Sequence, residues 1–312
     1  MKKSTKRTLL AALIIFSVGV LLSTVSFIVA LTTETDIYND ASHVYDFSSF
    51  SLSFDEVKER AHAGEASNFS ELLLSFNDAE LEIRKTDGVT QFEFYNVDQN
   101  NLEFSYVAGT LKLCQPQKNN RLGFYVGGGD ISFGGLRHFF HGASTRTSPK
   151  LVIHWNPSDS LASVRIDLTA GAVLVDELPQ NTALFADLSV GNISVSNCNS
   201  PNRAMDLHTG VGSIDSTNNR FETANFSNTT GNITLVDTFA NTTATSTVGI
   251  LTFRLDQSIQ RIRAQATTTF GSVHLPSGEH GGNQYNWNVA ESEFTARITT
   301  TVGDIYLEEI EQ

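Results

Sequence analysis

The chain has 312 residues, of which 40% are hydrophobic and 18% are charged, and its formal net charge is −13. This balance allows a hydrophobic core and suits β-structure, with Thr, Ser, Asn and Gly at the outer positions. No basic run occurs beyond the N-terminus, so nucleic-acid binding, which requires clustered Lys and Arg to neutralise phosphates, is not expected.

The N-terminus joins a basic tip to a long apolar run. Four cations within the first seven residues precede 23 residues without a charge, from Leu9 to Leu31. A membrane-spanning helix needs about 20 apolar residues, and the cations stay on the cytoplasmic side. A cleaved signal peptide is the alternative, but its apolar region is usually only about 7–15 residues long. Residues 1–31 are therefore predicted to be a cytoplasmic tip and a retained transmembrane anchor, which places the rest of the chain outside the cell membrane.

Residues 32–158 separate this anchor from the regular part of the chain. Residues 32–74 are predicted to be a stalk or linker that contains a short helix near Phe54–Ala63. Between residues 75 and 158, alternating apolar side chains predict strands. These strands are expected to form the first layers of a stack, or a cap that covers its open end. Residues 123–142 interrupt the alternation and are predicted to be a loop insertion.

Residues 159–312 repeat one short pattern seven times: a strand-like segment, a glycine and an alternating apolar strand. Of the fourteen positions two and four residues after the glycines, thirteen are apolar, and so are all seven positions five residues before them. The first six glycines are 18 to 22 residues apart, and the last gap is 32. Such a period indicates stacked units, none of which buries its apolar face alone. The glycines are Gly171, Gly191, Gly212, Gly231, Gly249, Gly271 and Gly303.

These glycines are predicted to be corners of successive coils. Side chains alternate along a strand, and the inward row changes phase at each glycine, where a residue without Cβ permits a bend. The positions directly before the glycines, such as Val211 and Phe270, are assigned to the inward row. The predicted fold is therefore all-β: a β-solenoid, a parallel β-helix-like stack of coils of about 20 residues behind one N-terminal transmembrane helix. An antiparallel β-sandwich is the alternative, because it also has short alternating strands.

Three aspartates form the candidate ligand-binding row. Asp167, Asp187 and Asp206 each precede a leucine in successive units. In a solenoid they would stack on one outer face, where carboxylates about 5 Å apart repel each other and could recruit a cation or a basic partner. A solvated acidic edge without a ligand is the alternative, and it is the one that we favour.

No motif predicts catalysis. The chain contains no GxSxG elbow, no CxxC pair and no spacing of metal ligands, so no catalytic residue, cofactor or metal is predicted. Cys114 and Cys198 lie far apart in sequence, which leaves open whether they pair.

The recurring phrase Gly-[Asn/Ser/Asp]-[Ile/Val]-x-Leu/Val, which begins at Gly191, Gly231, Gly271 and Gly303, supports a family resemblance. Together with one N-terminal membrane helix, it resembles the bacterial putative-adhesin family over about residues 75–312. The resemblance implies an extracytoplasmic domain, linked to cell-envelope stress systems in Gram-positive bacteria, that has no established catalytic residues. The insertion at 123–142 and the long last gap depart from the family pattern.

These observations predict a membrane-anchored cell-surface β-solenoid that binds or senses something at the envelope without catalysis. The expected partners are the membrane, through residues 9–31, and a cell-wall polymer or a membrane protein. One alternative is an enzyme that acts on polysaccharide through the acidic face. A structural or assembly protein that pairs through a solenoid edge is the other.

Overall fold

The computed structural model describes residues 49–62, 69–97, 99–115, 123–126, 129–132, 149–256, 262–275, 282–287 and 294–310. No helix in these ranges is long and apolar enough to cross a membrane. The predicted anchor at 9–31 and most of the predicted stalk lie outside the described residues.

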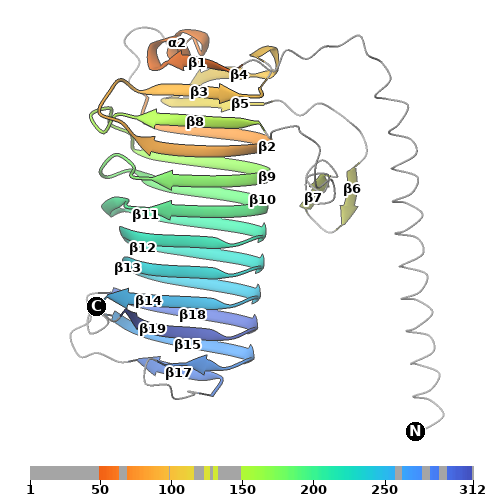
Figure 1. Cartoon of the computed structure of the whole chain (residues 1–312), viewed down its shortest axis with the longest axis vertical. Coiled ribbons are helices and arrows are strands. Elements are labelled where there is room, and N and C mark those ends of the chain that lie inside the picture. Colours follow the sequence, from red (N-terminus) through yellow and green to blue (C-terminus); the bar gives the residue numbers. More distant parts are fainter. Residues whose placement is uncertain are drawn as a thin grey trace, which may run out of the picture. The chain divides into compact units, whose positions relative to one another are not determined.

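The N-terminal part of the described chain forms one end of a stack of strands (Figure 1). Strands β6 (Gly123–Val126) and β7 (Gly129–Ser132) lie in the predicted insertion and pair with each other as a separate two-stranded sheet. The other elements of this part are β1 (Phe50–Ser53), α2 (Phe54–Arg60), β2 (Glu71–Lys85), β3 (Gln91–Tyr95), the short 3-10 helix η1 (Gln99–Asn101), β4 (Glu103–Val107), β5 (Thr110–Cys114) and β8 (Lys150–Trp155).

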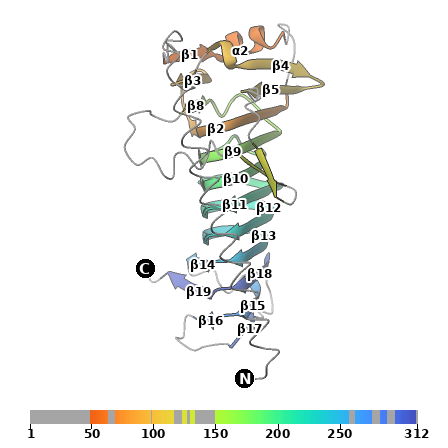
Figure 2. The same cartoon turned by 90° about the vertical axis from the view of Figure 1, so that its right-hand side faces the viewer.

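The C-terminal part builds the regular coils, which follow one another in both views (Figures 1 and 2). In every coil, the segment before the corner glycine lies in one layer, which we call the pre-glycine layer. The segment after the glycine lies in the other layer, the post-glycine layer. The strands are β9 (Ser163–Asp176), β10 (Ala183–Ser196), β11 (Asn199–Val211), β12 (Ile214–Thr230), β13 (Ile233–Val248), β14 (Leu251–Asp256), β15 (Ile262–Phe270), β16 (Val273–His274), β17 (Gln284–Trp287), β18 (Phe294–Val302) and β19 (Ile305–Ile310).

Neighbouring coils pair in parallel and in matching register. Strand β9 pairs with β10 from Ser163 opposite Ala183 to Asp176 opposite Ser196, on both sides of the corner. Strands β12 and β13 continue the same parallel pairing. A sandwich of antiparallel sheets would reverse direction between neighbours. The predicted β-solenoid is therefore confirmed, and the sandwich alternative is wrong.

The corner glycines have a steric reason. All seven have φ between 135° and 157°, a region that residues with a Cβ rarely adopt. A Cβ at any of them would lie 1.7–2.0 Å from the carbonyl oxygen of the corner residue in the adjacent coil. Glycine therefore allows the coils to approach closely as well as to bend.

The stack begins one coil earlier than the glycine pattern indicates. Strand β2 pairs in parallel with β9 on both sides of the corner, and Ala79 lies opposite Gly171. Because Ala79 replaces the glycine and 92 residues separate it from Gly171, neither the corner residue nor the spacing identified this coil. The segment between the two coils forms the cap.

The last two coils stack in the reverse of their chain order. Strand β18 pairs on one side with β13 and on the other with β15, and β19 lies in the same way between β14 and β16. Both views show β18 between β13 and β15 (Figures 1 and 2). The long gap between Gly271 and Gly303 holds β17, which pairs antiparallel with the outer edge of β15 before the chain returns.

The cap continues both layers and then closes them. Strand β5 extends the pre-glycine layer and β8 extends the post-glycine layer, each parallel to β2. Antiparallel β4 and β3 follow, and β1 pairs with β3. Helix α2 begins with a capping box between Ser53 and Glu56 and buries Val57. Helix α2 contacts both β1 and β4, the last strands at this end of the stack.

The core lies between the two layers and follows the predicted rows, with one correction. Residues two and four positions after the corners are buried in most coils, such as Ile233 and Leu235 at 1% exposure each. The residues directly before the corners were assigned to the same core, but Val211 is 50% exposed and Phe270 69%. The chain already turns at that position, so we infer that these side chains point along the outer edge.

Ser216 is the one polar residue among the fourteen positions that follow the corners, and the structure shows why. Ser216 is fully buried, and its hydroxyl is 2.8 Å from the hydroxyl of Thr238 and accepts from Asn219 Nδ2 at 2.9 Å. Asn219 also accepts from the backbone N–H of Cys198 at 2.8 Å. Buried polar groups need such partners, so this cluster replaces apolar packing at the turn that leads to the next coil.

Candidate functional site

The acidic row lies on the outer side of the pre-glycine layer. Asp167 and Asp187 are direct neighbours across β9 and β10, and both are exposed. The adjacent row carries Arg165 and Phe185, with the guanidinium 5.2 Å from the ring centre. Desolvation raises the pKa of the Asp167 carboxyl, Arg165 opposes this, and the charge of Asp187 adds to it.

Asp206 does not belong to this row. It lies opposite Phe185, and His208 is the residue opposite Asp187. The corner of this coil is Gly212, six residues after Asp206, whereas Asp167 and Asp187 each lie four residues before their corners. The shared Asp-Leu pair suggested an alignment that the corner glycine does not follow. The structure therefore brings two of the three predicted carboxylates together, and no group of three metal-ligating side chains occurs among the described residues.

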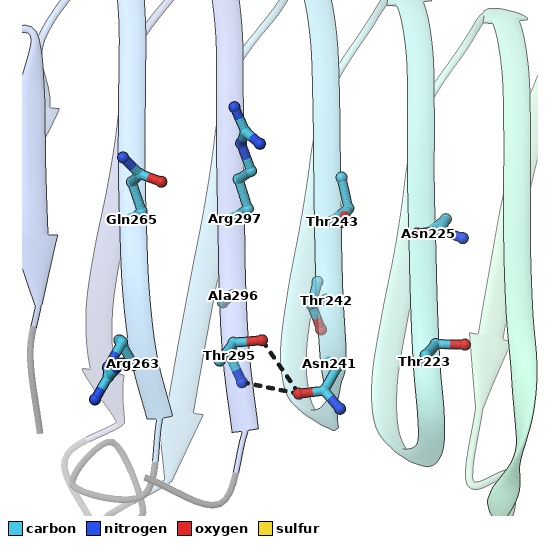
Figure 3. Close-up of a pocket in the computed structure, with 10 residues that line it drawn as sticks. All are labelled: Thr223, Asn225, Asn241, Thr242, Thr243, Arg263, Gln265, Thr295, Ala296 and Arg297. Carbon is cyan, nitrogen blue, oxygen red and sulfur yellow. Dashed lines mark hydrogen bonds between the residues drawn. The ribbon is translucent and has the colours of Figure 1, made fainter. Parts of the chain in front are cut away.

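Farther along the same outer face the structure forms a hollow of about 440 Å³ (Figure 3). Its lining consists of two arginines with amide and hydroxyl side chains, and it contains no carboxylate. The lining residues are Thr223, Asn225, Asn241, Thr242, Thr243, Arg263, Gln265, Thr295, Ala296 and Arg297.

Two outward rows from four coils build this hollow. In one row Thr223, Asn241, Thr295 and Arg263 lie opposite one another in turn. In the next row the order is Asn225, Thr243, Arg297 and Gln265. Asn241 Oδ1 accepts from the backbone N–H of Thr295 at 3.2 Å and from its hydroxyl at 3.1 Å, as Figure 3 shows. This contact joins β13 to the inserted strand β18.

No motif or periodicity in the sequence identified this site. Arg263 and Arg297 both lie an even number of residues before their glycines, which predicts an outward direction. Their proximity depends on β18 lying beside β15, with Arg263 opposite Thr295 and Arg297 opposite Gln265. In a chain rich in Asn and Thr, the surrounding residues gave no separate signal. The coil order, which is not local in sequence, was the missing information.

A second charged cluster lies where the post-glycine layer meets the cap. Glu82 is only 3% exposed and forms ion pairs with Arg84 and with Lys150, the latter at 2.9 Å. Burial opposes ionisation, but hydrogen bonds from Lys150 and Arg84 hold the pKa of the Glu82 carboxyl below its usual value. Nearby, His154 Nε2 lies 3.3 Å from Glu93 Oε2. We interpret this cluster as a structural network, because both cations neutralise a carboxylate that is largely shielded from solvent.

Both cysteines are unpaired thiols. Cys198 is buried, which raises its pKa to about 12. Desolvation also raises the pKa of the half-buried Cys114. A reactive cysteine needs a lowered pKa, so neither residue is a candidate nucleophile.

The sequence matches the model of the Toastrack DUF4097 family over residues 77–308. The chain belongs to this family. The match confirms the resemblance inferred from the glycine motif, and it extends from β2 to β19, which includes the inserted coil.

Several solved structures are similar to this Toastrack chain at low identity. A putative cell adhesion protein from Clostridium sporogenes is 14% identical, over 84% of this chain and 99% of that chain, with a TM-score of 0.30. A putative adhesin from Bacteroides fragilis is 13% identical, over 84% and 98%, with a TM-score of 0.41. A lipid binding protein, described as putative, from Parabacteroides distasonis is 12% identical, over 85% and 96%, with a TM-score of 0.33. Comparison with curated proteins gave no match.

Proposed function

We propose that this Toastrack chain is a non-catalytic binding module at the cell surface, held in the membrane by residues 9–31. The observation that carries the proposal is the outer side of the pre-glycine layer. It presents amide, hydroxyl and charged side chains in rows that repeat from coil to coil at the strand spacing of about 4.8 Å. Such a fixed, extended array suits recognition of a repeating partner.

The topology part of the proposal rests on the sequence of the N-terminus. A run of 23 residues without a charge follows the four cations, which suits a single span with the C-terminal domain outside. The register of the acidic row also bears on the enzyme alternative. That alternative relied on three stacked carboxylates, whereas Asp206 lies outside the row of Asp167 and Asp187.

Two measurements test this function. Protease treatment of intact cells should remove the solenoid while a cytoplasmic control protein survives. The detergent-solubilised full chain should also co-sediment saturably with isolated cell walls or with native membranes. A solenoid that resists protease until the cells are lysed would contradict the surface location. Absence of saturable binding to both fractions would contradict the binding function.

A further inference from the structure

We propose that the hollow around Arg263 and Arg297 binds an extended, hydroxyl-rich anionic polymer, through oxyanion groups such as phosphate or carboxylate. This inference rests on the proposed function, because it names the ligand chemistry of the same outer face. The two possible sources, polyol phosphates and acidic sugars, share the chemistry that the hollow offers.

The charge of the lining is the first argument. The chain carries a net charge of −13, yet the residues that line this hollow include two arginines and no carboxylate. Both arginines are exposed, and neither has an ion-pair partner among the residues that the structure describes. Guanidinium groups hold phosphate and carboxylate with two parallel hydrogen bonds. An oxyanion can therefore bind here without displacing a described internal partner.

The positions of the two arginines indicate an extended ligand. They occupy diagonal positions on neighbouring strands, since Arg263 lies opposite Thr295 and Arg297 opposite Gln265. Strand spacing and rise place such positions about 8 Å apart at Cα. The two guanidinium groups point away from each other in Figure 3. A ligand that contacts both must therefore carry separated anionic groups, as a polymer does and a single small ion does not.

The neutral groups indicate that this ligand is rich in hydroxyls. Asn225, Asn241 and Gln265 are exposed amides that both donate and accept hydrogen bonds, and exposed threonines lie between them. This combination matches the hydroxyl groups of sugars and polyols. The lining has no aromatic side chain on which a base could stack, and its one apolar residue, Ala296, is buried. Acyl chains and single-stranded nucleic acids are therefore poor matches.

The test measures binding of defined oligomers to the full chain in nanodiscs of neutral lipid. The probes are glycerol-phosphate oligomers, galacturonate oligomers, neutral malto-oligomers, inorganic phosphate and vesicles with anionic headgroups. The variant carries Arg263→Gln and Arg297→Gln together. The matched control is Arg220→Gln, because Arg220 is an exposed arginine of the same stack outside the hollow. Thermal unfolding followed by circular dichroism verifies that all variants fold.

The expected result is saturable binding of at least one anionic oligomer, reduced at least tenfold in the double variant and unchanged in the control. Binding of only the glycerol-phosphate or only the galacturonate oligomer supports the proposal and identifies the source. Unchanged binding by the double variant would overturn it. So would equal binding of neutral oligomers, or binding of anionic vesicles alone.

The inference and the proposed function can fail separately. If the wild-type chain binds cell walls and the double variant binds them equally well, the surface function stands and the arginine site is wrong. If oligomer binding depends on the arginines but the solenoid is cytoplasmic, the site stands and the surface function is wrong.

Discussion

The two halves of the stack bury different types of side chain next to the same type of corner. Three residues before the corner, the coils of β2, β9 and β10 bury Phe76, Leu168 and Leu188. From β11 onward the equivalent buried residues are polar. Three of them donate to a corner carbonyl, as Thr209 does to Gly191 O at 2.9 Å, whereas the buried Ser246 hydroxyl has no partner among the described residues. The polar residues are Thr209, Asn228, Ser246, Thr300 and Thr268.

This difference teaches that the corner itself, and not the side chain beneath it, defines the fold. The same positive φ and the same close approach occur in both halves. In the apolar half the inner position is stabilised by removal of hydrocarbon from water. In the polar half the inner residue stabilises the fold where its side chain donates a hydrogen bond to the backbone carbonyl at the bend. Four predictions test this comparison.

The largest effect is expected from an alanine at a corner, in either half. The added Cβ would lie 1.9 Å from Gly171 O in Gly191→Ala and 2.0 Å from Gly212 O in Gly231→Ala. The clash and the positive φ should together cost about 4 kcal/mol or more. Urea unfolding should show losses of similar size in the two variants. Gly88→Ala is the control, since its nearest contact would be 3.5 Å, and a loss confined to one half would contradict a common corner.

A truncation of the apolar inner row should have the next largest effect. Leu188 is fully buried, and Leu188→Ala should cost about 2–5 kcal/mol by loss of burial and creation of a cavity. The midpoint of urea unfolding measures this cost. Leu174→Ala is the matched control, because Leu174 is 39% exposed. Equal midpoints for the two variants would mean that this row does not stabilise the corner.

A change in the polar inner row should cost less. Thr209→Val keeps the side-chain shape but removes the hydrogen bond to Gly191 O. The carbonyl of Gly191, a partly buried residue, then loses a partner, which costs about 1–3 kcal/mol. Thr247→Val, at an exposed position, should leave the free energy of unfolding nearly unchanged. If Thr209→Val is as stable as the wild type, the polar row acts through packing alone.

The smallest effect, and the only one that depends on pH, concerns Glu82 on the outer side of the apolar half. Its folded pKa lies below the usual value of 4.5, so its ion pairs stabilise the fold above the unfolded pKa. This contribution is lost as the pH falls through the folded pKa. Glu82→Gln should cost about 1–2 kcal/mol at pH 7, reduced from a fully buried pair because Lys150 and Arg84 are partly exposed.

Chemical denaturation at several pH values measures this effect. The stability difference between Glu82→Gln and the wild type should shrink below about pH 4. A difference that stays constant with pH would show that the two cations do not act through the charge of this carboxylate.

The sequence predicts the parts of this fold that are local. Each glycine and the apolar rows around it lie within a few residues, so the corners and the inward rows after them could be assigned without a structure. The exposure of Val211 and Phe270 was missed because strict alternation does not describe a chain that is already turning. The corner of the first coil was not identified because Ala79 takes the place of a glycine.

The candidate site was less predictable, since it depends on register and on coil order. Asp206 is followed by a leucine, as Asp167 and Asp187 are. The row in which it lies depends on whether Gly210 or Gly212 is the corner of its coil. Arg297 reaches the side of Gln265 because a later coil enters between two earlier ones. No periodicity in a single sequence shows such an exchange of neighbours.

The inserted coil also sets a condition on the time course of folding. A ribosome makes residues 262–275 before residues 294–310, yet the later segment forms the inner layer between β13 and β15. The coils from β2 to β14 can add one by one as the chain emerges, since each needs only its predecessor. The edge of β15 that pairs with β18 therefore stays unpaired until β18 has been made. Until residues 294–310 have been made, the free edge of β13 is therefore the point at which an incomplete chain is most open to pairing with another molecule.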